Sequence, residues 1–137
     1  MILDSGNSSY GMYYNWYTAT ATMGYYGGPT GGVAVSICPN GWKLPRAYTS
    51  PNEFQGLVDQ YNTVDKITAA PANFVYSGIR QSSTNTTIGQ GGIGYYYGGA
   101  TRWNGFGEGL YLDSSGNLTV GGGLSSGDGM PIRCIAR

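Results

Sequence analysis

The stretch ICPNGWKLP, residues 37–45, separates two parts of the chain with different character. Its central PNG triplet is a strong turn signal, because proline and glycine favour the backbone angles of tight turns. Before the turn lie a short apolar segment, residues 33–38, and an aromatic-rich region in which residues 12–17 are predicted to form a strand. After it comes the clearest helical pattern of the sequence. The stretch therefore predicts a change from strand and loop to helix.

Residues 50–61 are predicted to form this helix. Ser50 suits the N-cap, Pro51 suits the first helical position, and Glu53 completes a capping box. The apolar residues that follow recur at the spacing of one helix face. They are Phe54, Leu57, Val58 and Tyr61. No other segment of the sequence has a convincing helical pattern.

The second half of the chain is predicted to consist of short strands and long loops. A turn at residues 113–116 is expected to join two strands as a hairpin, and residues 130–136 are expected to form the closing strand. The other strand candidates are residues 74–80, 93–97, 109–113 and 117–120. Short antiparallel strands, one clear helix and long irregular loops predict an α+β domain.

Length and charge exclude several classes of function. The 137 residues suffice for one domain, spanning residues 1–137, with seven Lys and Arg, seven Asp and Glu, and no histidine. Zero net charge without a basic run argues against nucleic acid, because phosphate binding needs clustered positive charge. The absence of histidine excludes His-based triads, zincins and facial-triad iron sites, and we expect no cofactor and no bound metal. No apolar run is long enough to span a bilayer, so direct membrane insertion is not expected.

Enzymatic activity is not expected from the remaining polar residues. A glycosidase needs two facing carboxylates, and Glu108 with Asp113 or Asp128 could supply them, but no motif requires this pair. A cysteine nucleophile would lack a histidine base. The glycine-rich runs are not followed by a helix pattern or a Lys-Ser/Thr pair, so they do not predict a phosphate-binding loop.

The composition of residues 95–128 favours ligand binding instead. Tyr, Ser, Gly and Asn in loops are typical of antibody paratopes, because tyrosine gives a large contact area at little entropic cost. Trp103, Asn104 and Phe106 are expected to be exposed in a glycine-punctuated loop, whereas Tyr95 and Tyr111 fit either core or surface. The candidate ligand-contacting residues are Tyr96, Tyr97, Thr101, Arg102, Trp103, Asn104, Phe106, Glu108, Tyr111, Asp113, Ser125, Ser126 and Asp128.

The two cysteines, Cys38 and Cys134, do not have the spacing of a metal site. Their positions fit either two buried thiols or one long-range disulfide. A disulfide would indicate an exported protein, because such bonds persist in oxidising compartments.

Three motifs together resemble a known family. They are YNWYTATA at residues 14–21, ICPNGWKLP at residues 37–45 and PIRCIAR at residues 131–137. With these motifs the chain resembles, over residues 10–137, the Fibrobacter succinogenes major paralogous domain family, whose members look like C-type-lectin-like domains. The segment YYGGA at residues 96–100 departs from the YWSST stretch that this family usually carries. The resemblance implies a C-type-lectin-like fold.

The resemblance also bears on the cysteines and on two kinds of chemistry. The family's paired positions match Cys38 and Cys134, which implies a disulfide between them. The enzyme branch of the superfamily needs two active-site cysteines close together, so the resemblance does not imply its activity here. The calcium-dependent sugar motifs of animal lectins are absent, since Trp103 and Asn104 are followed by Gly105.

Lectin-like domains of this kind are similar to the target proteins of diversity-generating retroelements, in which adenine-specific mutagenesis rewrites codons near the 3′ end of the gene. The resemblance thus implies a non-enzymatic adhesin or receptor module with a diversified surface at residues 95–128. Its expected partner is an unknown protein or glycan on another surface, and its expected location is extracellular or at the cell surface. No signal peptide is visible, and we expect a domain excised from a longer surface protein. The alternatives are a structural domain of a bacterial surface protein without a specific ligand, and a phage tail receptor-binding domain.

Overall fold

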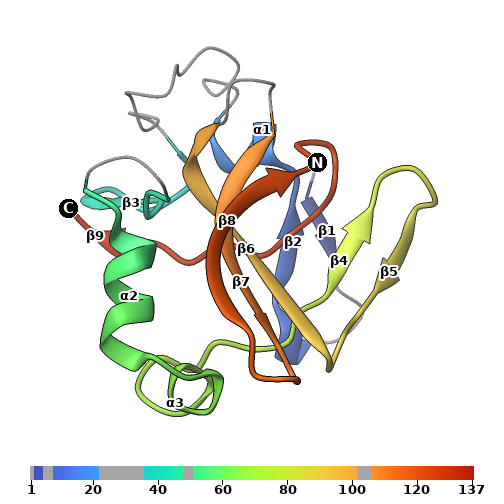
Figure 1. Cartoon of the computed structure of the whole chain (residues 1–137). Helices are drawn as coiled ribbons and strands as arrows, with labels where there is room; N and C mark the ends of the chain where they lie inside the picture. The colour runs from blue at the N-terminus through green and yellow to red at the C-terminus, as the bar shows by residue number, and fades with distance from the viewer. Residues whose placement is uncertain (1, 5–7, 22–35, 48–50, 102–105) are drawn as a thin grey trace.

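A three-stranded antiparallel sheet, in the order β6–β7–β8, lies at the centre of the molecule (Figure 1). The computed structural model describes residues 2–4, 8–21, 36–47, 51–101 and 106–137. The strands of the central sheet are β6 (Ile93–Thr101), β7 (Gly107–Asp113) and β8 (Leu118–Leu124). Antiparallel pairs are formed by β1 (Ile2–Asp4) with β2 (Met12–Tyr14), β3 (Trp42–Lys43) with β9 (Ile135–Ala136), and β4 (Ile79–Gln81) with β5 (Thr86–Ile88). Short antiparallel strands and helices confirm the expected α+β class.

The main hydrophobic core lies on one face of the central sheet. Strand β7 is buried along most of its length because it lies between β6 and β8. Leu110 and Leu112 point to the same face, as residues two apart in a strand do, and Tyr96 of β6 lies opposite Leu110. The buried members of this first core cluster are Ala47, Phe54, Val64, Ile67, Ala72, Phe74, Tyr96, Leu110 and Leu112.

The predicted helix is present as α2 (Glu53–Tyr61). Its apolar face is confirmed: Phe54 is buried, and Leu57, Val58 and Tyr61 pack against the first core cluster. Its start differs from the prediction, because Asn52 is the N-cap and its side chain accepts a hydrogen bond from the Gln55 amide at 2.9 Å. Ser50 lies outside the described residues.

Glu53 does not close a capping box. Its carboxylate forms an ion pair with Lys43 and accepts a hydrogen bond from the backbone amide of Arg46 at 2.8 Å. Burial raises the pKa of Glu53, but these hydrogen bonds outweigh it and leave the pKa lowered. The residue therefore fastens the start of α2 to the segment that follows β3.

Two short helices were not predicted from the sequence. α1 (Trp16–Ala19) follows β2, so the strand expected at residues 12–17 ends early. The cause is Asn15, whose side chain accepts a hydrogen bond from the Thr18 amide at 2.9 Å and caps the helix. α3 (Val64–Thr68) begins after the N-cap Thr63 and contributes buried residues to the first core cluster. One turn of helix is too short to show a periodic pattern in sequence.

Two predicted strands are shorter than expected, whereas the predicted hairpin is confirmed. Of residues 74–80, only the end belongs to a strand, β4, and of residues 130–136 only the end belongs to β9. In the rest of residues 130–136, isolated bridges pair Met130 with Tyr14 and Ile132 with Tyr97. The turn after Asp113 joins β7 to β8 as predicted.

A disulfide joins Cys38 to Cys134, with their Cα atoms 5.8 Å apart. It lies beside the β3–β9 pair and connects positions separated by 96 residues. In the loop-entropy model a cross-link of this span stabilises the fold by about 4–5 kcal/mol. The bond confirms the pairing that the family resemblance implies.

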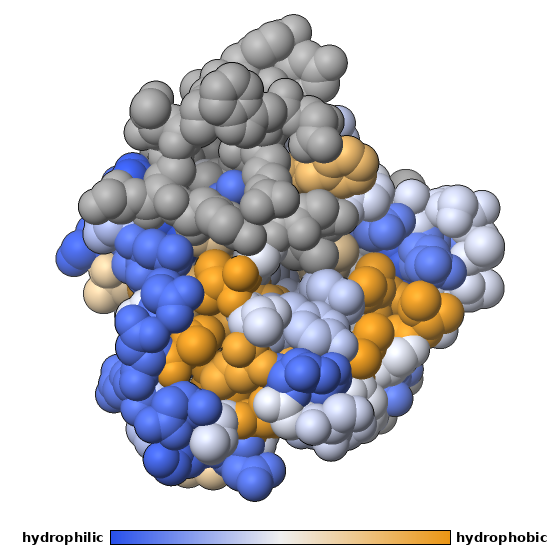
Figure 2. All heavy atoms as spheres, in the orientation of Figure 1, coloured by the Kyte–Doolittle hydropathy of each residue, from blue (hydrophilic) through white to orange (hydrophobic). Residues whose placement is uncertain are grey.

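Apolar side chains also gather at the surface between α2, whose outer face is hydrophilic, and the sheet beside it (Figure 2). The partly buried residues Leu57, Val58, Leu118 and Val120 pack there against the first core cluster. No helix in the described ranges is long and apolar enough to cross a membrane.

Candidate functional site: a loop surface beside a polar pocket

The end of the central sheet at which β6 ends and β7 begins carries the exposed part of the predicted binding region. Phe106, immediately before β7, is 39% exposed, and Tyr17 of α1 is 38% exposed. α1 lies directly against this end, because a Cβ atom built on Gly107 would be 3.0 Å from Cδ1 of Trp16. We call the surface formed by Tyr17, Phe106, Ser125, Ser126 and Asp128 the loop surface.

Buried Tyr97 fixes the loop that follows β8. Its side chain is 0% exposed, and its hydroxyl lies 2.6 Å from the carbonyl oxygen of Ser125 and 2.8 Å from that of Asp128, both of which are acceptors. Burial is the largest cause that raises the pKa of this phenol, so the hydroxyl keeps its proton and remains a donor. Tyr97 packs with Trp16 and Met130 in the second core cluster.

The prediction that Tyr96 and Tyr97 contact a ligand at the loop surface is therefore corrected. Tyr96 is 2% exposed, and its hydroxyl donates to the carbonyl oxygen of Val75 and accepts from the Val75 amide. Both residues alternate into core clusters on opposite faces of β6. Tyr97 holds the loop that follows β8, and Tyr96 holds the segment at Val75 against the sheet.

Asp128 links the loop surface to the β4–β5 hairpin. Its carboxylate oxygen Oδ1 accepts hydrogen bonds from the amide and the hydroxyl of Ser82, each at 2.8 Å. On the other side of the same loop, the Trp16 amide donates to the carbonyl oxygen of Ser126 at 3.1 Å. The loop is thus held between α1 and the hairpin.

A small pocket of about 130 Å³, lined by polar residues and glycines, opens between this loop and the hairpin. Arg80 supplies its positive charge and donates hydrogen bonds to Asn85 Oδ1 at 2.9 Å and to Thr87 Oγ1 at 3.3 Å. Guanidinium, amide and hydroxyl groups together can hydrogen-bond a small polar part of a ligand. The lining residues of this hairpin pocket are Asn15, Arg80, Gln81, Ser82, Asn85, Gly127 and Gly129.

The hairpin pocket was not predicted from the sequence. Ser82 and Asp128 are 46 residues apart, and neither belongs to a motif that signals their contact.

Asp113 lies at the other end of β7, about 20 Å along the strand from Gly107, and Tyr111 lies two residues before it, about 13 Å from Gly107. Asp113 caps the hairpin turn: its carboxylate accepts hydrogen bonds from the amides of Ser115 and Asn117, from Asn117 Nδ2 at 2.7 Å and from the Tyr111 hydroxyl at 2.6 Å. The Tyr111 ring also packs against the Tyr95 ring, with centroids 4.7 Å apart. Tyr111 and Asp113 therefore stabilise the turn and lie apart from the loop surface.

The remaining predicted residues divide between the core, the loop surface and the part of the chain outside the description. Glu108 is buried within β7 and does not lie on the loop surface. Thr101 is the last residue of β6, so its backbone lies at the end of the sheet that carries the loop surface. Arg102, Trp103 and Asn104 lie outside the described residues.

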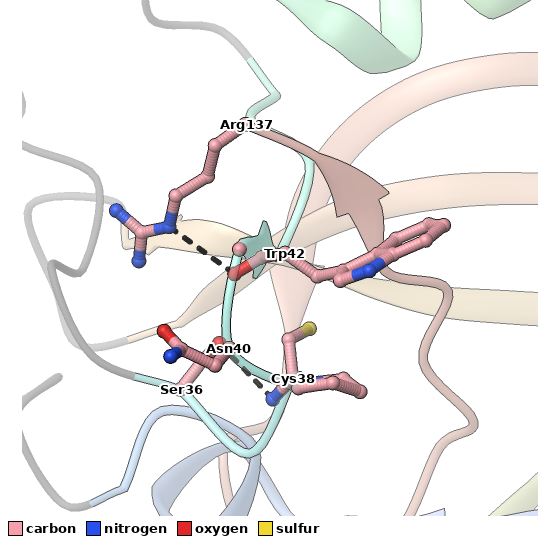
Figure 3. Close-up of a pocket in the computed structure, with 7 residues that line it drawn as sticks. Ser36, Cys38, Asn40, Trp42 and Arg137 are labelled. Carbon is pink, nitrogen blue, oxygen red and sulfur yellow. Dashed lines mark hydrogen bonds between the residues drawn. The ribbon is translucent and has the colours of Figure 1, made fainter.

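A further, more open pocket of about 440 Å³ lies beside the disulfide (Figure 3). The amide of Cys38 donates to Ser36 Oγ, and Nε of Arg137 donates to the carbonyl oxygen of Trp42, each at 3.3 Å. The indole of Trp42 extends away from Arg137 in this view. The guanidinium of Arg137 and the indole of Trp42 therefore extend in different directions at this pocket.

Three comparisons with known proteins, against protein-family models, curated proteins and solved structures, find no match for this chain. Within the described ranges, no group of three or more His, Cys, Asp or Glu side chains could hold a metal ion.

The turn at Asp113 generates a prediction about pH. The Tyr111 hydroxyl, followed by Asn117, lowers the pKa of Asp113 from 3.8 to about 2, and the same bond raises the pKa of Tyr111 from 10.0 to about 12. Stability from Asp113 is thus fully present above the unfolded pKa and is lost as pH falls toward 2, whereas that from Tyr111 is lost as pH rises from 10 to 12.

We expect Asp113→Asn to lower the unfolding free energy at neutral pH and to match the wild type near pH 2, as measured by denaturant titration. Asp59→Asn is the control, because it removes the same charge from the exposed surface of α2. An equal gap between wild type and Asp113→Asn at pH 7 and at pH 2 would contradict this role of the carboxylate.

Proposed function

We propose that the chain is a non-enzymatic ligand-binding module that uses the loop surface together with the hairpin pocket. One observation carries the proposal: Tyr17 and Phe106 remain exposed, whereas Tyr96 and Tyr97 are buried, and the loop that contains Ser126 and Asp128 borders the hairpin pocket. Exposed aromatic side chains beside adaptable polar groups are the usual anchors of recognition surfaces.

Two of the three carboxylates considered for a hydrolytic pair, Asp113 and Asp128, hold structural partners. Asp128 holds Ser82, and Asp113 holds the β7–β8 turn at the opposite end of the strand. A hydrolytic pair must face one cleft at a separation of about 5–10 Å, whereas Glu108, the common member of both predicted pairs, is 4% exposed within β7. This supports a binding role over a catalytic one.

We further propose a C-type-lectin-like fold and membership of the Fibrobacter succinogenes major paralogous domain family, with the chain as target protein of a diversity-generating retroelement. The disulfide supports this, since the family's paired positions match it and since such bonds indicate an exported protein. The adhesin or receptor role at a cell surface, with a protein or glycan as partner, follows from the same proposal.

Diversification makes a prediction about sibling genes. Their codons are expected to differ at the exposed position Phe106 and the partly exposed position Ser126. They are expected to agree at the framework positions Tyr97 and Asp113, because changes at these two positions would release the loop or the turn. Sequencing of sibling copies checks this. Substitutions spread evenly along the gene, or concentrated at Tyr97 and Asp113, would contradict diversification of the loop surface.

The binding face is tested with an array of purified glycans and cell-surface proteins. We expect the double variant Tyr17→Ala with Phe106→Ala to lose the array signals of the wild type and to stay folded. Its unfolding free energy should fall by no more than about 2 kcal/mol, since both side chains are partly exposed and Tyr17 packs edge-on against Trp16. Ile88→Ala is the matched control, because Ile88 is 42% exposed on β5, away from the loop surface.

Retention of all signals in the double variant would overturn the assignment of the loop surface. A wild-type chain that binds no member of the array in either class would instead favour a structural domain without a specific ligand.

A further inference from the structure

A second pocket, of about 340 Å³, lies on a different part of the molecule. It opens between η1 (Ser8–Tyr10) and β2 on one side and the segments at residues 73–75 and 131–133 on the other. None of the residues that define the loop surface lines it. Its principal lining residues are Tyr10, Met12, Tyr14, Asn73, Ile132 and Arg133.

We infer that this pocket is a separate ligand site that takes an acidic sugar, with Arg133 binding the carboxylate. The inference does not rest on the proposed function of the loop surface, because the two sites share no residue.

Arg133 is held in place by uncharged groups. Its guanidinium lies over the ring of Phe74, 4.8 Å from the ring centroid, and one of its N–H groups donates to the carbonyl oxygen of Ala72. In the described part of the chain it forms no ion pair with a carboxylate. A guanidinium has five N–H donors, so most of its donors are left for a ligand.

A carboxylate is the anion that matches this charge. The planar fork of a guanidinium forms two parallel hydrogen bonds with a carboxylate, and a single arginine neutralises its one negative charge. Arg133 is the one charged residue among those that line the pocket in the described ranges. A phosphate group with nearly two charges would keep part of its charge unpaired.

The other walls fit a sugar ring. Tyr10 and Tyr14 are partly exposed and present amphipathic rings, which pack against C–H groups while their hydroxyls meet polar ones. Across the pocket, Asn73 donates its side-chain amide to the carbonyl oxygen of Pro71 at 3.3 Å, and its amide oxygen can accept from a sugar hydroxyl. Together with Arg133 these groups match the hydroxyls, apolar face and carboxylate of a uronic acid.

The inference is tested by NMR titration of the whole chain, labelled with ¹⁵N, using methyl β-D-glucuronide and the matched neutral sugar methyl β-D-glucoside. We expect the glucuronide to shift the amides of Tyr14, Ile132 and Arg133, and the glucoside to leave them unchanged. Arg133→Lys keeps the positive charge and removes the fork, so it should weaken binding about tenfold.

Asn73→Gly is a second variant, which tests the site independently if Arg133→Lys does not fold. Asn73 has a φ angle of 50°, a left-handed conformation that glycine adopts readily, so the variant removes the amide without straining the backbone. We expect it to weaken glucuronide binding severalfold while its spectrum remains that of the folded protein.

Equal shifts with glucuronide and glucoside, or binding unaffected in folded Arg133→Lys, would overturn the assignment of Arg133. Acetate that binds as tightly as glucuronide would overturn the assignment of a sugar. Shifts at Ser126 in place of Arg133 would overturn this site and leave the proposed loop surface standing.

Discussion

The hydroxyl of Tyr97 is the interaction on which the candidate binding surface depends. It reaches the carbonyl oxygens of Ser125 and Asp128, 28 and 31 residues further along the chain, from a side chain buried in the core. A buried hydrogen-bonding group without its partner costs about 1–3 kcal/mol, so the loop has a strong preference for this one conformation. Through Asp128 the same loop then orders the β4–β5 hairpin by way of Ser82.

Glycine has two uses in this chain that composition alone does not separate. At Gly98, a Cβ atom would lie 3.0 Å from the carbonyl oxygens of Pro45 and Glu108, and at Gly107 it would meet the rings of Trp16 and Tyr97. These glycines belong to the framework, because Gly98 lets backbone segments approach closely and Gly107 lets two aromatic rings pack directly on the sheet. The glycine-rich region after Tyr95 is therefore partly core and only partly display surface.

The sequence predicted the features that depend on local chemistry. The apolar face of α2 and the hairpin turn at Asp113 were predicted because their signals lie within a few residues of each other. The one-turn helix α1 was missed because its cap, Asn15, stands inside an apparent strand pattern. The sequence also did not predict which of the candidate site residues are buried and which remain at the surface. Whether a tyrosine is buried depends on contacts such as that between Tyr97 and Asp128, which no local pattern contains.

The most direct measurement is amide hydrogen exchange in the variant Tyr97→Phe, which removes only the hydroxyl. The amides of Asp128 and Gly129, bonded to Ser125 and Arg80 at 3.1 and 2.7 Å, report on the loop. They should exchange about tenfold faster or more than in the wild type, as expected for the loss of a buried hydrogen bond, while the chain stays folded. Unchanged exchange at these two amides would contradict the claim that buried Tyr97 holds the loop surface in place.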